Sequence, residues 1–215
     1  MKLLAKILNR ISRTLQIMIK AGMHVNKYHA LRTWEVSFFS SPSPHFIKQA
    51  CVLRNGLKGS TYIETGTYLG DTAALLSSVA ERVISIEPEI KLYQLAQFRF
   101  ENSKNIEIIN GTSESIFPVL IPKLRGDVSF WLDGHHSSGV TFQGSKDTPI
   151  IEELNEIGKN LLNLNKVVVM IDDVRCFDPS IAGFEDYPTR SYLVNWADKN
   201  KLTWTIEHDI FIARN

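Results

Sequence analysis

The chain has little cysteine and no long hydrophobic run. Its 215 residues include two cysteines, Cys51 and Cys176, which match no metal-ligand spacing and suggest no disulfide framework. We therefore expect two reduced thiols and a reducing compartment, the cytoplasm. The sequence also has no run of about 20 apolar residues, the length that a transmembrane helix needs. It lacks the continuous apolar block of a secretory signal as well.

Acidic residues are missing from the first 34 positions, which contain seven basic residues. The whole chain has 24 basic and 23 acidic residues, so the remainder has 17 basic against 23 acidic. This mildly acidic body argues against nucleic acid as the main partner. Residues 1–20 read as a basic amphipathic helix, because apolar residues recur there at helical spacing. Such a helix can pack on the domain, pair with another subunit in a homo-oligomer, or lie on the inner face of a membrane.

From residue 45 onward, short apolar segments alternate with helical ones. Strands are expected near residues 61–64, 83–86, 106–109, 128–132 and 167–171, and helices near 46–55, 72–80, 89–101, 114–121, 149–162 and 190–200. Residues 202–207 and 210–213 read as a final hairpin. The pattern predicts an α/β fold, a Rossmann-like, doubly wound, mostly parallel seven-stranded sheet with a C-terminal antiparallel hairpin and N-terminal helices. Residues 1–44 form a helical extension in this reading, and residues 45–215 form the domain.

The turn after the first strand lacks the glycines of a dinucleotide-binding fingerprint. That fingerprint would need glycine at positions 66, 68 and 71, but Tyr68 and Asp71 stand at the last two. Asp71 also places negative charge at a helix start, where phosphate would otherwise bind. A ligand without phosphate is favoured, and Glu64 at the strand end suits a positively charged group. S-adenosylmethionine has both properties.

Here the sequence resembles the class I S-adenosylmethionine-dependent methyltransferases. Glu64, Gly66 and Gly70 match their first motif, and Glu87 matches the acid that ends the next strand and binds the ribose hydroxyls. Thr112 departs from the family, which often has an acid there. Either Thr112 or Ser113 can contact the base, and Ser113 can equally be a helix N-cap. The resemblance implies a set of donor-binding residues: Glu64, Gly66, Thr67, Tyr68, Gly70, Asp71, Thr72, Glu87, Thr112, Ser113 and Asp133.

Acids also follow the fourth and fifth predicted strands. Asp133, Asp172 and Asp173 would converge if those strands are neighbours, and clustered carboxylates repel each other unless a cation is present. The layout is similar to metal-dependent O-methyltransferases of sugars and other small molecules, which implies that the three acids bind Mg²⁺ or another divalent cation. Arg175, beside the acid pair, would bind either an anionic substrate group or a neighbouring acid.

Two histidines follow Asp133. The resemblance places a catalytic base two positions after the first metal ligand, where this chain has His135, and His136 competes for that role or for the metal. The predicted activity is methylation of a hydroxyl on a sugar, a glycan or another small molecule. Two other readings stay open: a metal-dependent hydrolase that uses the same acids and histidines, and a methyltransferase-like binding module without turnover.

Overall fold

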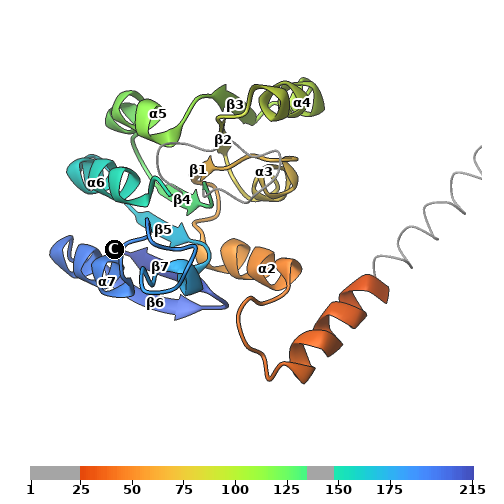
Figure 1. The fold of residues 1–215 in the computed structure, drawn as a ribbon. Coiled ribbons are helices and arrows are strands. Elements are labelled where there is room, and N and C mark those ends of the chain that lie inside the picture. The colour runs from red at the N-terminus through yellow and green to blue at the C-terminus, as the bar shows by residue number, and fades with distance from the viewer. Residues whose placement is uncertain (1–24, 135–147) are drawn as a thin grey trace, which may run out of the picture.

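The computed structural model describes residues 25–134 and 148–215 as a seven-stranded sheet with helices on both faces (Figure 1). The strands are β1 (Thr61–Thr65), β2 (Arg82–Glu87), β3 (Ile106–Asn110), β4 (Val128–Leu132), β5 (Val167–Ile171), β6 (Thr203–Glu207) and β7 (Ile210–Arg214). Their spatial order is β3-β2-β1-β4-β5-β7-β6. The first five strands are parallel, and β7 runs antiparallel to both β5 and β6. The predicted fold class is confirmed, including the C-terminal hairpin.

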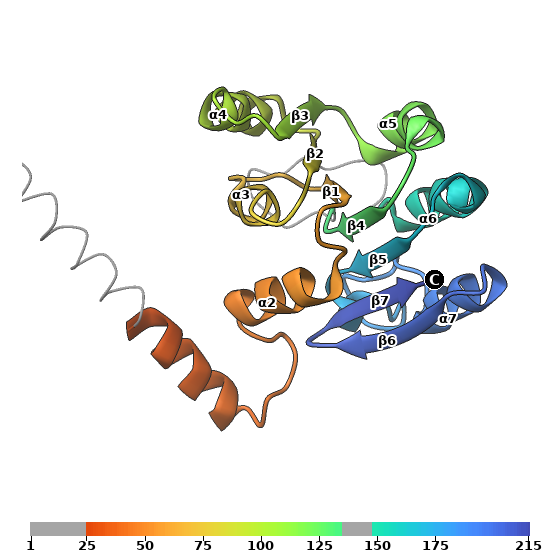
Figure 2. The ribbon, with the colours of Figure 1, turned by 180° about the vertical axis from the view of Figure 1, so that it is seen from behind.

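Two hydrophobic layers hold the helices onto the sheet. The helices are α2 (His45–Asn55), α3 (Asp71–Leu76), α4 (Ile90–Phe100), α5 (Ser113–Leu120), α6 (Ile150–Asn160) and α7 (Arg190–Lys199), with short 3-10 turns at Ile121–Lys123, Leu161–Asn163 and Val174–Cys176. One buried cluster joins α2, α3 and α4 to the sheet, and the other joins α5, α6 and α7 to its opposite face. Figure 2 shows these two sets of helices from behind, with the sheet between them.

The central strands β4 and β5 are apolar apart from Ser129, because both of their faces are covered. All five residues of β4 and of β5 are buried, as expected for parallel strands with helices on both sides. The chain winds from β1 to β2 and β3 in one direction, and it then returns to β4 and β5 on the other side of β1. The order of the strands therefore reverses between β1 and β4, and ligands of such sheets bind at this reversal point, beyond the carboxyl ends of the strands.

Three local boundaries differ from the sequence expectation. Helix α3 ends at Leu76 and not near residue 80, because the hydroxyls of Ser77 and Ser78 donate to the carbonyls of Ala74 and Leu75 and compete with further helical bonds. Pro149 is the N-cap of α6 and precedes its first turn. The N-cap of α5 is Thr112 and not Ser113, which the sequence analysis had considered for this position, and the Thr112 side chain makes no capping hydrogen bond.

A separate helix precedes the domain. Residues 25–36 are helical and extend away from the sheet (Figure 1). This helix contacts the domain through Trp34, whose ring lies 5.8 Å from that of His208, and through Lys27, whose ammonium lies 5.4 Å from the centre of the Phe46 ring. Val36, Phe38 and Phe39 are exposed there. The amphipathic pattern of residues 1–20 lies outside the described residues. Among the residues that the structure describes, no helix is long and apolar enough to cross a membrane.

Candidate functional site

The two glycines of the turn after β1 are both required by the packing of the chain itself. Gly66 has a φ of 85°, and a Cβ atom there would lie 2.6 Å from the carbonyl oxygen of Asp133, at the end of β4. Gly70 has a φ of 81°, and a Cβ atom there would lie 2.6 Å from the ring of Phe100. Side chains rarely adopt such positive φ values, and neither site has room for one. Glycine at 66 brings the β1 turn against the β4 end at the point of strand reversal.

The acid at the end of β1 lies beneath this turn without solvent exposure. Glu64 Oε2 accepts a hydrogen bond of 2.5 Å from the hydroxyl of Ser85 on β2, and that hydroxyl lies 2.6 Å from the hydroxyl of Thr67. Glu64 Oε1 has no hydrogen-bond partner in the described part of the chain. Burial raises the pKa of Glu64 to about 8, with smaller contributions from the nearby acids Asp133 and Glu87. Glu64 is therefore a largely neutral acid at pH 7, with one oxygen available for a cationic group.

Trp131 presents a second unmatched polar atom on the same face. It pairs in register with Glu64 across the β1–β4 ladder, so both side chains point toward the α2–α4 side of the sheet. The indole Nε1 of Trp131 is buried and has no hydrogen-bond partner among the described residues. Buried polar atoms are nearly always satisfied in native proteins, so two unmatched atoms on neighbouring strands indicate a place for a polar ligand group.

The acid at the end of β2 is held in place by the main chain. Glu87 is 3% exposed, and its Oε2 accepts from the amide of Tyr68 at 2.8 Å while its Oε1 accepts from the amide of Glu89 at 2.9 Å. Burial raises the pKa of Glu87, and the hydrogen bonds from these two backbone amides oppose the rise. A carboxylate offers about four lone-pair sites, so each oxygen can still accept a bond from a hydroxyl. The turn thus fixes the orientation of this carboxylate.

The other residues predicted to bind the methyl donor differ in their exposure and in their location in the fold. Tyr68 has a φ of 49° and is half exposed, whereas Asp71 begins α3 and pairs with Arg99 at 2.7 Å. Thr72 is half-buried in α3. Thr112 and Ser113 open α5, on the other side of β2 and β3 from α3, and Ser113 is buried. Asp133 follows β4, with its amide donating to the carbonyl of Thr65 at 3.3 Å.

The acids after β5 already have cationic partners. Lys48 from α2 donates to Asp172 Oδ1 at 2.6 Å and to Asp173 Oδ1, and its ammonium lies 3.7 Å from Asp209 Oδ2. Arg175 donates to Asp173 at 2.5 Å and also to Asp209. Of the two partners that the sequence left open for Arg175, a substrate anion or a neighbouring acid, the structure therefore shows the neighbouring acid. Burial lowers the pKa of Lys48, but its ion pairs with Asp172 and Asp173 outweigh burial and raise it.

The ion pairs of Lys48 involve two of the three acids that were predicted to bind a metal ion. Strands β4 and β5 are neighbours, as the prediction required. However, the described residues contain no group of three or more His, Cys, Asp or Glu side chains that could hold a metal ion. The Lys48 ammonium lies between Asp172 and Asp173 and supplies the positive charge that their repulsion demands. Asp172 and Asp173 as placed here do not fit a divalent cation. The predicted bases His135 and His136 lie outside the described residues.

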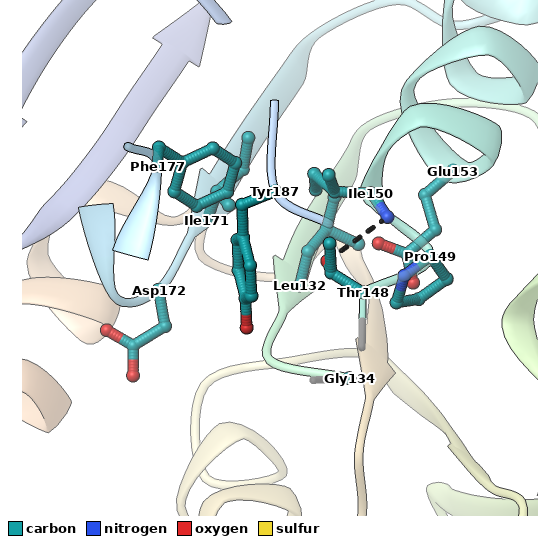
Figure 3. Close-up of a pocket in the computed structure, with 10 residues that line it drawn as sticks. All are labelled: Leu132, Gly134, Thr148, Pro149, Ile150, Glu153, Ile171, Asp172, Phe177 and Tyr187. Carbon is teal, nitrogen blue, oxygen red and sulfur yellow. Dashed lines mark hydrogen bonds between the residues drawn. The ribbon is translucent and has the colours of Figure 1, made fainter. Parts of the chain in front are cut away.

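Lys48 and Glu153 are functional candidates that the sequence reading missed. No sequence signal marks Lys48, since it precedes the acids by more than 120 residues. Glu153 did carry a signal, because it interrupts an apolar helical stripe formed by Ile150, Leu154 and Ile157. Its carboxyl lies beside a recess between the ends of β4 and β5 (Figure 3).

Comparisons with known proteins give the fold. The sequence matches no protein-family model and no curated protein. The structure is similar to that of a SAM-dependent methyltransferase from Aquifex aeolicus, with a TM-score of 0.50 and 16% identity over 77% of this chain and 87% of that chain. It is also similar to a candidate rRNA methylase from Clostridium thermocellum, with a TM-score of 0.50 and 14% identity over 78% of this chain and 93% of that chain. The chain therefore has the Rossmann-like fold that these methyltransferase structures share.

Proposed function

We propose that this protein is an S-adenosylmethionine-dependent methyltransferase that methylates a hydroxyl of a sugar, a glycan or another small molecule. One observation carries the proposal: two buried carboxyl groups, Glu64 and Glu87, end adjacent parallel strands on either side of the glycine turn. An isolated buried acid costs stability, and two at a ligand-binding strand end indicate selection for binding. The fold shared with methyltransferase structures supports this reading.

Each acid has a distinct role in donor binding. Glu87, whose orientation is fixed by the amides of Tyr68 and Glu89, would accept the ribose hydroxyls. Glu64, with its unmatched Oε1, would accept the ammonium group. The donor supplies an electrophilic methyl group on sulfur, and the protein contributes position and a dry environment.

The proposed reaction does not use a metal ion. Asp172 and Asp173 are paired with Lys48, and we derive no step through a metal ion. The acceptor is proposed to be a small molecule and not RNA, because residues 35–215 have more acidic than basic side chains.

The first test is calorimetry with S-adenosylhomocysteine. We expect binding to the full chain, and we expect Glu87→Ala to weaken it by about 1.5–3 kcal/mol, the scale of a hydrogen bond to a charged group. Glu107→Gln is the matched control, since Glu107 is an exposed acid on β3 paired with Arg82. Tighter binding of NAD than of S-adenosylhomocysteine, or equal affinity in the folded Glu87→Ala variant, would reject the assignment.

The second test identifies the acceptor. Transfer of a labelled methyl group is measured with a panel of glycans, simple sugars, polyols and phenols, and with an RNA oligonucleotide. Incorporation into a hydroxyl compound supports the proposal, whereas incorporation into the RNA alone would overturn the choice of acceptor.

A further inference from the structure

A small recess opens between the carboxyl ends of β4 and β5, on the sheet face covered by α5, α6 and α7. Its enclosed free volume is about 10 Å³, room for about one water-sized group such as a single hydroxyl. Its wall combines apolar and aromatic side chains with polar ones, and Figure 3 shows the carboxyl of Glu153 reaching from α6 toward Thr148 and Gly134. The lining residues that matter here are Leu132, Gly134, Ile150, Glu153, Phe177 and Tyr187.

Two buried polar atoms at this recess are unmatched. Glu153 and Thr65 are each 2% exposed, and neither Glu153 Oε1 nor Thr65 Oγ1 lies within normal hydrogen-bond distance of a partner among the described residues, although the Thr65 hydroxyl is near enough to the Glu153 carboxyl to oppose the rise of its pKa. Both atoms border the same point: a Cβ atom on Gly134 would lie 3.0 Å from Thr65 Oγ1 and 3.6 Å from Glu153 Oε1. An unmatched buried acceptor costs free energy, so two beside one recess indicate a hydrogen-bonding ligand.

The recess adjoins the turn that we assign to the donor. The main chain at Asp133 and Gly134 is the common wall, because a Cβ atom on Gly66 would lie 2.6 Å from the Asp133 carbonyl and 3.4 Å from the Gly134 Cα. Glu64 lies on one face of the sheet, and Thr65, the next residue of β1, points to the other. Glu153 is therefore next to the donor turn without belonging to it.

We propose that Glu153 is the base of the methyl transfer and that the recess receives the hydroxyl end of a small, uncharged acceptor. This inference rests on the proposed function and adds the site and the substrate class. A hydroxyl fits because it donates a hydrogen bond to Glu153 Oε1 and accepts one from Thr65 Oγ1. An anionic acceptor group is disfavoured, because Asp172 lines the same recess.

The chemical step balances with these groups. The acceptor oxygen uses a lone pair to form a bond to the methyl carbon, and the bond from carbon to sulfur breaks with its electron pair going to sulfur. The sulfonium donor becomes a neutral thioether, and the hydroxyl proton passes to the Glu153 carboxylate. Burial raises the pKa of Glu153 to about 7, with the hydroxyls of Ser113 and Thr65 opposing the rise and the acids Glu114 and Glu152 adding to it. A base with such a pKa is matched to neutral pH.

Infrared spectroscopy tests the recess without a known acceptor or a bound donor. The full chain is labelled with ¹³C-glutamate at its side-chain carboxyls, and the spectrum of Glu153→Gln is subtracted to isolate the Glu153 band. Ethylene glycol, a two-carbon diol, is expected to shift this band by donating a hydrogen bond. Gly134→Ala should abolish the shift, because its methyl group occupies the point between Thr65 and Glu153.

Glu156→Gln is the matched control. Glu156 lies one turn further along α6, pairs with Lys159 at 2.8 Å and does not line the recess. Its substitution should leave the diol-induced shift unchanged. An unshifted Glu153 band in high concentrations of ethylene glycol would overturn the hydroxyl site, whatever the outcome of donor binding.

Kinetics test the role of the base on any acceptor that the methyl-transfer panel identifies. Glu153→Gln should lower kcat by about 10²–10⁴-fold, the range for loss of a general base, while the affinity for S-adenosylhomocysteine stays within about twofold. A kcat equal to that of the wild type would overturn the base role. Failure of S-adenosylhomocysteine to bind the wild type would instead reject the proposed function, and the infrared result would still decide whether the recess takes a hydroxyl.

Discussion

The affinity for S-adenosylhomocysteine should rise with pH because of Glu64. Burial raises the pKa of this carboxyl to about 8, so in the ligand-free protein it is mostly protonated at pH 6. A ligand ammonium at Oε1 favours the ionised form, and binding must then release the proton. The free energy of that release falls as the pH rises, and it disappears above the pKa of the free protein.

The size of the effect follows from the ionised fraction of Glu64. With a pKa of about 8, that fraction is about 1% at pH 6 and about one half at pH 8. If Glu64 is ionised in the complex at both pH values, affinity should rise about 50-fold between them, or about 2.3 kcal/mol. The ligand amine also titrates, and its contribution must be removed.

Comparison with the Glu64→Gln variant removes the contribution of the ligand amine. The glutamine is neutral at every pH, so the ratio of wild-type to variant affinity cancels the titration of the ligand itself. Calorimetry at pH 6, 7 and 8, in two buffers with different ionisation enthalpies, gives both the affinity and the number of protons released. The wild-type protein should release close to one proton at pH 6 that the variant does not release. A pH-independent ratio of affinities would refute the assignment of the ammonium to Glu64.

Three further predictions concern Lys48, the metal ion and the N-terminal segment. Lys48→Met should lower the free energy of unfolding by about 3–5 kcal/mol, because it leaves the carboxylates of Asp172 and Asp173 buried without their ammonium partner; chemical denaturation measures this, with Lys48→Arg as the charge-preserving control. Methyl transfer should also persist in excess chelator, and its loss there would show that a metal ion binds despite Lys48. Deletion of residues 1–20 should leave S-adenosylhomocysteine binding intact while reducing either association with anionic liposomes or oligomer size. Unchanged values of both would contradict the two accessory roles proposed for this segment.

Strand positions could be predicted from the sequence because burial on both faces leaves a strong signal. The run of Val167–Ile171 is apolar at every position, and the strand has the predicted bounds. The end of α3 could not be predicted in the same way, since Ser77 and Ser78 end the helix through local side-chain bonds that any apolar pattern ignores. The positions of Glu64 and Glu87 could be predicted because they stand at the ends of strands that sequence spacing identifies, while their role in donor binding stays a prediction.

Lys48 and Glu153 could not be identified as site residues from the spacing of residues in the sequence alone. Lys48 reaches Asp172 only because α2 packs on the face of the sheet next to β5, and this approach depends on tertiary structure. Glu153 was overlooked for a different reason. Its position in the apolar stripe of α6 was readable, but the recess that gives the position a chemical meaning is formed by residues from β4, β5 and the segment after β5.

The collision that Gly66 avoids with the carbonyl of Asp133 has a consequence for tracing relatives of this chain. If the proposed function is correct, a descendant that had lost methyl transfer would still need glycine there to fold, so the glycine pattern by itself identifies an architecture and not an enzyme. Glu64 is different, because a fully buried carboxyl with an unmatched oxygen weakens the fold and would drift to an apolar residue once binding ceased to matter. Among divergent copies of this fold, the acid at this position should therefore separate those that still bind a donor from those that have become scaffolds.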